Sequence, residues 1–245
     1  ELPWLGNLHP KRLPPPTGTT GSKRVIADVA LPGRSDALAL PVAAATHHTH
    51  VIGPTGTGKS TLLANLIAQD MADGHSVVVI EPKGDLVEDV LRLVPADRYD
   101  DVVVLDPSDR SPVGLNPLDR RDRRPELIAD SILTILKRLY GKNIGPRSSD
   151  ILYAALLTLA HRDDASLVML PLLLTNPGFR RTMTMNVHDP LILGPFWAGF
   201  DRWSDAERAN ATAPALNKLR PLIRPGLRGV LGQRDPKFDV GRVFS

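Results

Sequence analysis

The stretch from Gly53 to Thr61 has the residue types and the spacing needed to hold a chain of phosphate groups. Its glycines allow backbone N–H groups to turn toward an anion, because no Cβ atom blocks the approach. Lys59 adds a positive charge, and Ser60 adds a hydroxyl of the kind that ligates Mg²⁺. This combination predicts binding of a nucleoside triphosphate together with magnesium.

The sequence around the stretch supports this interpretation. It reads GxxxxGKS, the phosphate-binding pattern of P-loop NTPases, and it lies between an apolar strand candidate at 50–52 and a good helix-forming segment at 62–68. We therefore expect ATP and Mg²⁺ as ligands, with Lys59 at the β- and γ-phosphates and Ser60 on the metal. The residues expected to contact the nucleotide are Gly53, Pro54, Thr55, Gly56, Thr57, Gly58, Lys59, Ser60 and Thr61.

An alternation of helices and apolar runs follows the loop. A helix is predicted over 59–72, a buried strand over 76–81, a short helix over 85–94 and a second buried strand over 101–106. This order indicates an α/β fold with a parallel sheet and right-handed crossovers.

Two carboxylates end the predicted strands. Ligands of such sheets bind at the carboxyl ends of the strands, so Glu81 and Asp106 are candidates for holding magnesium-bound water in catalysis. The alternative is that both are ordinary strand-end carboxylates that close turns, and the sequence leaves the two interpretations open.

The first fifty residues read as an arm followed by a small sheet. Residues 1–23 are rich in proline and predict a linker or surface arm. The segments 24–29 and 37–42 are strand candidates joined by Pro32-Gly33, and we expect them to form a hairpin beside the nucleotide core. His47, His48 and His50 are interpreted as residues that lead into a strand, since no carboxylate or cysteine accompanies them as a metal ligand would require.

From Pro125 the pattern becomes helical. We expect the nucleotide-binding core to occupy 24–124, an all-helical insertion to occupy 125–234, and the chain to start its return to the core over 235–245. Helices are predicted at 166–174, 191–203 and 204–219, and Ser148 or Ser149 is the expected cap of an earlier one. The two clearest apolar stripes are Ile128, Ile132, Ile135, Leu136 and Leu139, and then Leu152, Ala155, Leu156 and Leu159.

Positive charge gathers near the end of the chain. Residues 208–242 contain eight basic side chains against Asp235 and Asp239, although the formal net charge of the whole chain is only +3. Such a region permits polyanion binding, and a solvated or protein-facing surface is the equal alternative. The basic residues are Arg208, Lys218, Arg220, Arg224, Arg228, Arg234, Lys237 and Arg242.

Three motifs together resemble the conjugative coupling proteins of type IV secretion. They are the loop at 50–60, the run Val79-Ile80-Glu81-Pro82-Lys83-Gly84-Asp85-Leu86, and Leu105-Asp106-Pro107 with Gly114-Leu115-Asn116-Pro117-Leu118. These coupling proteins are TraG/TraD-like members of the FtsK–HerA superfamily, and the resemblance covers about residues 45–120 well.

The resemblance implies a fold and a function. The fold is a RecA-like P-loop NTPase core interrupted by an all-helical domain, assembled as a homo-hexamer. The function is ATP-driven transfer of single-stranded DNA, or of a relaxase–DNA substrate, through a type IV secretion channel. The parent protein would then act at the cytoplasmic face of the inner membrane, with this segment itself soluble.

The sequence departs from that family in two places. Glu81 stands where the family usually has Asp, and Pro107 follows Asp106 where a catalytic Glu would be expected. The second acidic motif of the family is missing, so we expect a truncated ATPase that binds ATP without hydrolysing it. The transition-state arginine would come from a neighbouring subunit, with Arg220, Arg224, Arg228 and Arg234 as candidates. The alternatives are a pilus-assembly secretion ATPase of the same superfamily and a non-hydrolysing nucleotide- or DNA-binding module.

Overall fold

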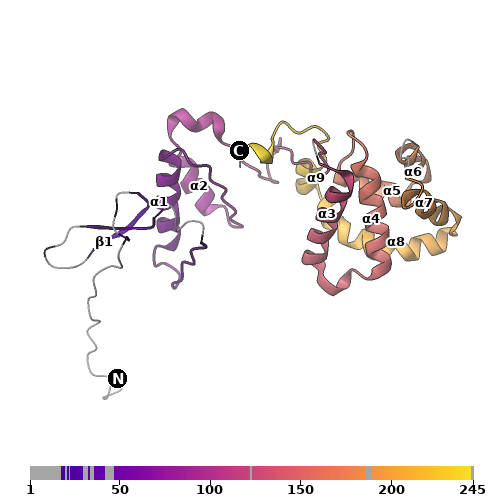
Figure 1. The fold of residues 1–245 in the computed structure, drawn as a ribbon, viewed down its shortest axis with the longest axis horizontal. Coiled ribbons are helices and arrows are strands. Elements are labelled where there is room, and N and C mark those ends of the chain that lie inside the picture. The colour runs from indigo at the N-terminus through magenta and orange to yellow at the C-terminus, as the bar shows by residue number, and fades with distance from the viewer. Residues whose placement is uncertain are drawn as a thin grey trace, which may run out of the picture. The chain divides into compact units, whose positions relative to one another are not determined.

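The computed structural model describes residues 18–19, 21, 23–29, 33, 36–41, 47–121, 123–185 and 189–243. Most of the predicted arm at 1–23 lies outside these residues. The chain divides into two compact units, one formed by residues 1–102 with 243–245 and the other by residues 103–242. We call them the loop unit and the helical unit, and each is described by itself (Figure 1).

The loop unit begins with the predicted hairpin. Strand β1, Val25–Asp28, pairs antiparallel with β2, Ala37–Ala39. This confirms the hairpin expected from the sequence. Helix α1 spans Lys59–Ala72, which are the predicted bounds, and α2 spans Asp85–Arg92, two residues short of the prediction. A 3₁₀ segment, η2, follows at Ala96–Asp101.

The hairpin is fixed to α1 by a glutamine that substitutes for a neighbouring strand. The Gln69 side chain accepts a hydrogen bond from Val25 N at 2.8 Å and donates one to Val25 O at 3.0 Å. Next to it, Arg24 Nε lies 3.2 Å from Asp70 Oδ1. Both backbone groups of Val25 are thus satisfied, and the free edge of β1 is joined to the second half of α1.

The segments predicted as central strands carry no strand hydrogen bonding among the described residues. Residues 76–81 and 102–106 run without regular secondary structure, and Ile52 and Ile80 are 81% and 91% exposed. Apolar side chains at this exposure gain nothing from burial. The parallel sheet therefore stays a prediction.

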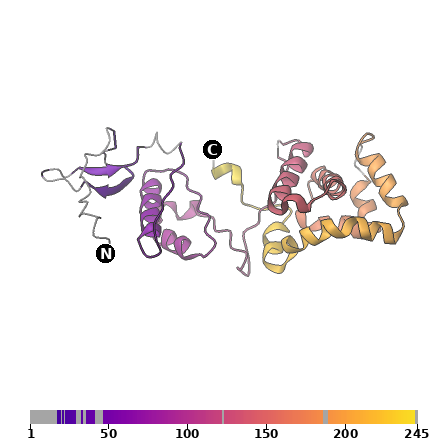
Figure 2. The same ribbon diagram turned by 90° about the horizontal axis from the view of Figure 1, so that it is seen from below.

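The helical unit contains the remaining helices. Figures 1 and 2 both place α9 at one end of this unit and α6 with α7 at the other, with α8 running between the two ends. The elements are α3 Pro125–Tyr140, η3 Gly141–Asn143, α4 Pro146–Ala160, η4 Leu167–Met169, α5 Leu170–Thr175, α6 Pro177–Thr184, α7 Leu193–Arg202, α8 Asp205–Leu219, η5 Arg220–Ile223, α9 Pro225–Leu231 and η6 Val240–Val243.

Helix α4 is the centre of the core and packs against α3, α5 and α8. The predicted stripe on α4 is confirmed, because Leu152, Ala155, Leu156 and Leu159 are all fully buried. The stripe predicted on α3 is confirmed at Ile128, Ile132 and Leu136 and was wrong at Ile135 and Leu139, which are 56% and 66% exposed. The buried face of α3 is turned toward Ala129 and Leu133, which join the three confirmed residues.

The start of one helix agrees with the sequence prediction, and the start of another does not. Ser204 caps α8 in a full capping box with Glu207, at the predicted start of that helix. The expected cap of α4 at Ser148 or Ser149 was wrong. That helix begins at Pro146, whose fixed φ suits the first helical position, and Ser148 is buried inside the first turn.

Asn116 joins three segments that are far apart in the sequence. Its buried Nδ2 donates to Ala165 O and to Arg234 O, each at 2.9 Å, and its Oδ1 accepts from Leu118 N at 3.1 Å. Nearby, Leu115 N donates to Val230 O at 3.0 Å. The segment that leads into the helical unit therefore runs against the segment that leaves it.

This pairing accounts for the difference between the expected and the observed division of the chain. Residues 103–124, which the sequence assigned to the nucleotide core, group with the helices. Gln233 Nε2 adds a bond of 2.8 Å to Pro112 O, and it lies so close to Gly114 that a Cβ there would meet the Gln233 amide. The segment 107–118 is thus part of the helical unit's packing.

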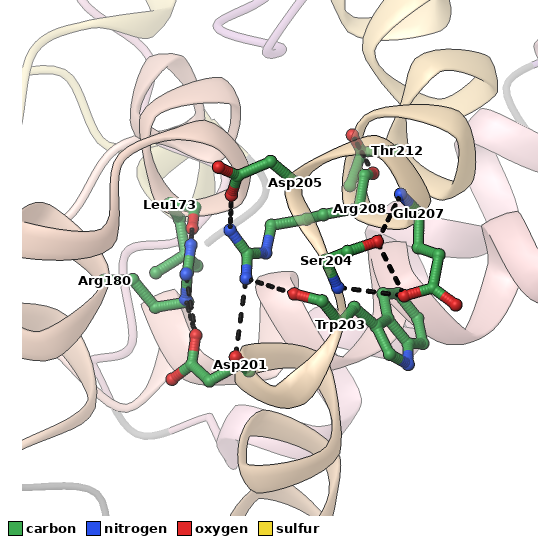
Figure 3. Close-up of polar contacts among 9 residues, drawn as sticks. All are labelled: Leu173, Arg180, Asp201, Trp203, Ser204, Asp205, Glu207, Arg208 and Thr212. Carbon is green, nitrogen blue, oxygen red and sulfur yellow. Dashed lines mark hydrogen bonds and ion pairs between the residues drawn. The ribbon is translucent and has the colours of Figure 1, made fainter.

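Two arginines organise the far end of the helical unit (Figure 3). Arg180 is 2% exposed, donates to Asp201 Oδ1 from two of its nitrogens at 2.7 and 2.8 Å, and lies over the Phe200 ring at 5.0 Å. Arg208 donates to Asp205 Oδ1 at 2.9 Å and to Trp203 O at 2.8 Å. These contacts hold α6, α7 and the start of α8 together.

We predict that Asn116→Ala destabilises the helical unit by about 1–3 kcal/mol, because buried backbone groups lose their hydrogen-bond partner. Asn217 on the exposed side of α8 supplies the matched control, since Asn217→Ala removes the same side chain without a buried bond. Denaturation followed by the fluorescence of Trp197, which is buried in this unit, measures both variants. Equal stability of the two variants would contradict the role given to Asn116.

The capping box of α8 predicts a pH dependence. Hydrogen bonds from the Ser204 backbone N–H and hydroxyl hold the pKa of Glu207 below its ordinary value. A depressed folded-state pKa contributes stability that is present above the unfolded pKa and is lost as pH falls through the folded one. Thermal melts from neutral to acid pH should therefore show an acid-induced loss that Glu207→Gln reduces, and a Gln variant with the same pH profile would refute the assignment.

Candidate phosphate-binding site

The loop before α1 turns tightly around its glycines. Gly56 and Gly58 have φ values of 81° and 80°, in the left-handed region that side chains with a Cβ avoid. A Cβ on Gly53 would lie 2.8 Å from Thr57 Oγ1, so a larger residue there would displace the Thr57 hydroxyl from its contact with Pro54 O. Each glycine of the pattern thus has a backbone or packing reason in the observed loop.

Lys59 folds back over the loop. Its Nζ donates to Gly53 O at 2.7 Å and to Pro54 O at 2.5 Å, while Thr57 Oγ1 donates to Pro54 O at 2.8 Å. The ammonium group is thereby held above the loop by carbonyls that carry no full negative charge. Two of its three N–H donors are used by these carbonyls, which leaves one donor for an anion.

The start of α1 presents backbone donors that nothing in the described chain satisfies. The first hydrogen bond of the helix runs from Leu62 N to Gly58 O at 2.9 Å. The N–H groups of Lys59, Ser60 and Thr61 come before it and have no acceptor within the helix. No side chain caps this end, and its first turn contains no acidic residue. Unsatisfied N–H groups and the positive end of the helix dipole favour an anion here.

Helix α1 is not alone in lacking a cap, since α4 and α9 also begin without a side-chain cap and without an acid in the first turn. Helix α8, by contrast, has the Ser204–Glu207 capping box. What distinguishes the start of α1 is the loop before it, with Gly56 and Gly58 in the left-handed region and Lys59 held over the loop carbonyls. Ser60 and Thr61 also bring hydroxyls to this end, where Ser60 could ligate a magnesium ion.

Glu81 is in the loop unit but is engaged in its own turn. Its carboxylate accepts hydrogen bonds from Lys83 N at 3.0 Å and from Gly84 N, which precedes α2. In this arrangement it closes the turn before α2, as the second interpretation of the sequence proposed. Its catalytic role stays a prediction.

Asp106 belongs to the helical unit and also closes a turn. It accepts from the Ser108 hydroxyl at 2.7 Å and from Ser108 N at 2.8 Å, and these two bonds lower the pKa of the carboxyl. Lys59 and Glu81 thus share one unit, whereas Asp106 lies in the other. The expected convergence of both carboxylates on the loop is untested.

The basic stretch at 208–242 separates into two kinds of residue. Arg208 is bound within the network of Figure 3, with its side chain only 15% exposed, which fits the protein-facing alternative for this residue. By contrast, the exposed basic residues without an acidic partner in the described part of the chain are Arg220, Arg224, Arg228 and Lys237.

Sequence reasoning missed some of the polar groups that shape the site. The contact of Thr57 with Pro54 O was not foreseen, although threonine hydroxyls can donate to the backbone carbonyl three residues earlier. The bonds of Asn116 join residues 49 and 118 positions away, and no local pattern could have indicated them.

The short helices α6 and α9 were also not predicted, because neither has a full apolar stripe.

Comparison with protein families gives one match. Residues 34–131 match the model of a family described as the type IV secretion-system coupling protein DNA-binding domain. The matched region includes the loop, both carboxylates and the first residues of α3, and most of the helical unit lies outside it. Searches of curated proteins and of solved structures gave no match.

No helix in the described part of the chain has the length and apolar character needed to cross a bilayer.

We predict that Gly58→Ala abolishes stabilisation of the chain by magnesium-ATP. Gly74 offers a matched control, because its φ is also 80° and it lies at the opposite end of α1. Each substitution places an alanine in the left-handed region, at a cost of about 1–2 kcal/mol. Thermal melts should show similar losses without nucleotide, and only Gly74→Ala should keep the rise with nucleotide. A retained rise in Gly58→Ala would contradict the site.

Proposed function

We propose that this chain is the ATP-binding part of a DNA-translocating ATPase that drives conjugative transfer through a type IV secretion system. The observation that carries the proposal is the uncapped start of α1 behind a glycine loop, with Lys59 above it. The family similarity supports the DNA-transfer side of the proposal. In such a motor, nucleotide bound at the phosphate site would power the transfer of DNA.

The described residues fit a magnesium–nucleoside triphosphate. The amides of Lys59, Ser60 and Thr61 would donate to phosphate oxygens, and Lys59 Nζ would turn from the loop carbonyls to the β- and γ-phosphates. Ser60 would ligate the magnesium ion. The bound nucleotide supplies the free energy of hydrolysis, and this chain's own contribution is to bind and orient the phosphates.

The parallel sheet forms part of the same proposal. Val78 and Ile80 are 58% and 91% exposed in a segment without ladder hydrogen bonds, and such a segment gains stability from a neighbouring strand on each side. Residues 76–81 and 101–106 would become central strands of a RecA-like sheet when further strands pair with them. A structure of an assembled ring in which these residues lie outside any ladder would refute this.

The state of the carboxylates favours nucleotide binding without turnover by this chain. Glu81 and Asp106 are each held by backbone amides of their own turns, which leaves neither arranged to orient a water molecule. The non-hydrolysing module therefore remains the second candidate for the chain as it stands. Homo-hexamer assembly, the relaxase–DNA substrate and an arginine from a neighbouring subunit belong to the proposed parent motor.

The first test is the dependence of nucleotide binding on Lys59. Magnesium-ATP should raise the melting temperature of the unaltered chain, and Lys59→Ala should lose that rise because the loop loses its fixed cation. Lys137→Ala is the control, since Lys137 is an exposed lysine of α3 without an ion pair in the described chain. Each variant is compared with its own melt without nucleotide, and equal rises in both variants would refute the assignment.

Hydrolysis gives a second and independent test. We expect phosphate release by the 245-residue chain to stay at background, although the chain binds ATP. Turnover that disappears in Lys59→Ala would show that the chain orients water by itself. Glu81→Gln and Asp106→Asn would then identify which carboxylate does so.

A further inference from the structure

A row of arginines runs across the short segments that follow α8. Arg220 begins η5, Arg224 directly precedes α9, and Arg228 lies one turn further along α9. All three are exposed, and none has an acidic partner in the part of the chain that the structure describes. We call these three residues the η5–α9 row.

The row differs from six other arginines of the helical unit, each of which has a carboxylate partner. These are Arg120, Arg121, Arg124, Arg162, Arg180 and Arg208. Arg234 is not included in the row. The pKa of Asp164 is lowered chiefly by its hydrogen bonds with Arg162, and the charge of Arg234 adds to this effect. The η5–α9 row thus places three arginines without an acidic partner, among the described residues, within nine positions of the sequence.

Packing fixes the direction in which α9 presents this charge. A Cβ on Gly226 would lie 2.6 Å from Pro107 O, and one on Gly229 would lie 2.8 Å from Pro112 Cγ. Val230 on the same side is buried and accepts from Leu115 N at 3.0 Å. One side of α9 is therefore pressed against the segment 107–118.

Helical geometry places the arginines on the other side. At about 100° per residue, Arg224 and Arg228 lie within one narrow arc. Gly226 and Gly229 lie roughly 100° to 200° away from that arc, on the packed side. The close glycine contacts and the Asn116 bond to Arg234 O make α9 a firm support, so the two guanidinium groups do not depend on a mobile loop for their position.

We propose that the η5–α9 row binds the backbone phosphates of DNA. Arginine forms bidentate bonds with phosphate, and such contacts hold a nucleic acid without reading its sequence. The proposal rests on the proposed function, which supplies DNA as the partner. It goes beyond it by placing a phosphate-binding surface on α9, outside the matched residues 34–131.

The salt dependence of DNA binding tests the row. Anisotropy of a labelled single-stranded oligonucleotide is titrated with the full chain at several salt concentrations. Each phosphate contact contributes about 0.7 to the slope of log K against log salt for single strands, so Arg224→Gln with Arg228→Gln should lower the slope by about 1.4. Adding Arg220→Gln should lower it by about 0.7 more.

The matched control lies at the other end of the same unit. Arg181 and Arg202 are exposed residues of α6 and α7 without an acidic partner in the described chain, so Arg181→Gln with Arg202→Gln removes the same charge. The control should keep the unaltered slope. Equal losses in both double variants, or no loss in either, would overturn the assignment. Circular dichroism melts establish that both variants remain folded.

Two further measurements distinguish a failure of this inference from a failure of the proposed function. Lys59→Ala should lose nucleotide binding and keep the DNA slope, because the loop and the row are different sites. Suppose that the Arg224→Gln, Arg228→Gln variant binds both nucleotide and DNA and has the same slope of log K against log salt as the unaltered chain. This result would overturn the role of the row and leave the proposed function intact. Absence of DNA binding by the unaltered chain would overturn both the row and the DNA partner. Binding to vesicles with anionic lipid but not to DNA would have the same consequence.

Discussion

The unsatisfied backbone N–H groups at the start of α1 determine what the loop unit can bind. A helix end without a side-chain cap and without an acid in its first turn is less stable than a capped one, unless an anion takes the place of the cap. The glycines at 56 and 58 keep that end open, and Lys59 holds a positive charge over it. The same features that leave α1 incomplete in the chain make it a phosphate site.

The rest of the loop unit secures the other end of α1. Gln69 and Asp70 bind the β-hairpin, and Arg98 donates to Met71 O at 2.9 Å and to His75 O at 3.0 Å. A cation on the last carbonyls of a helix is favourable for its dipole. Helix α1 is therefore held from its C-terminal half, and its N-terminal end remains free to bind a ligand.

Local signals in the sequence predicted the loop, the bounds of α1, the hairpin, the burial of α4 and the start of α8. Each of these depends on residues within a few positions of one another. The exposure of Ile135, the packing of 107–118 on α9 and the internal role of Arg208 depend on partners far along the chain. For the same reason, the sequence placed Glu81 and Asp106 beside the nucleotide only through a predicted sheet, and the turns that hold them were visible only in the structure.

Hydrogen exchange of the backbone amides measures the central claim most directly. If the open end of α1 binds phosphate, magnesium-ATP should slow exchange in a peptide that covers Gly56 to Thr61. A peptide over α4, which is buried in the helical unit, should be unchanged and serves as the internal reference. Slower exchange at the loop that disappears in Lys59→Ala is the predicted result. Unchanged exchange at the loop with saturating nucleotide would contradict the account.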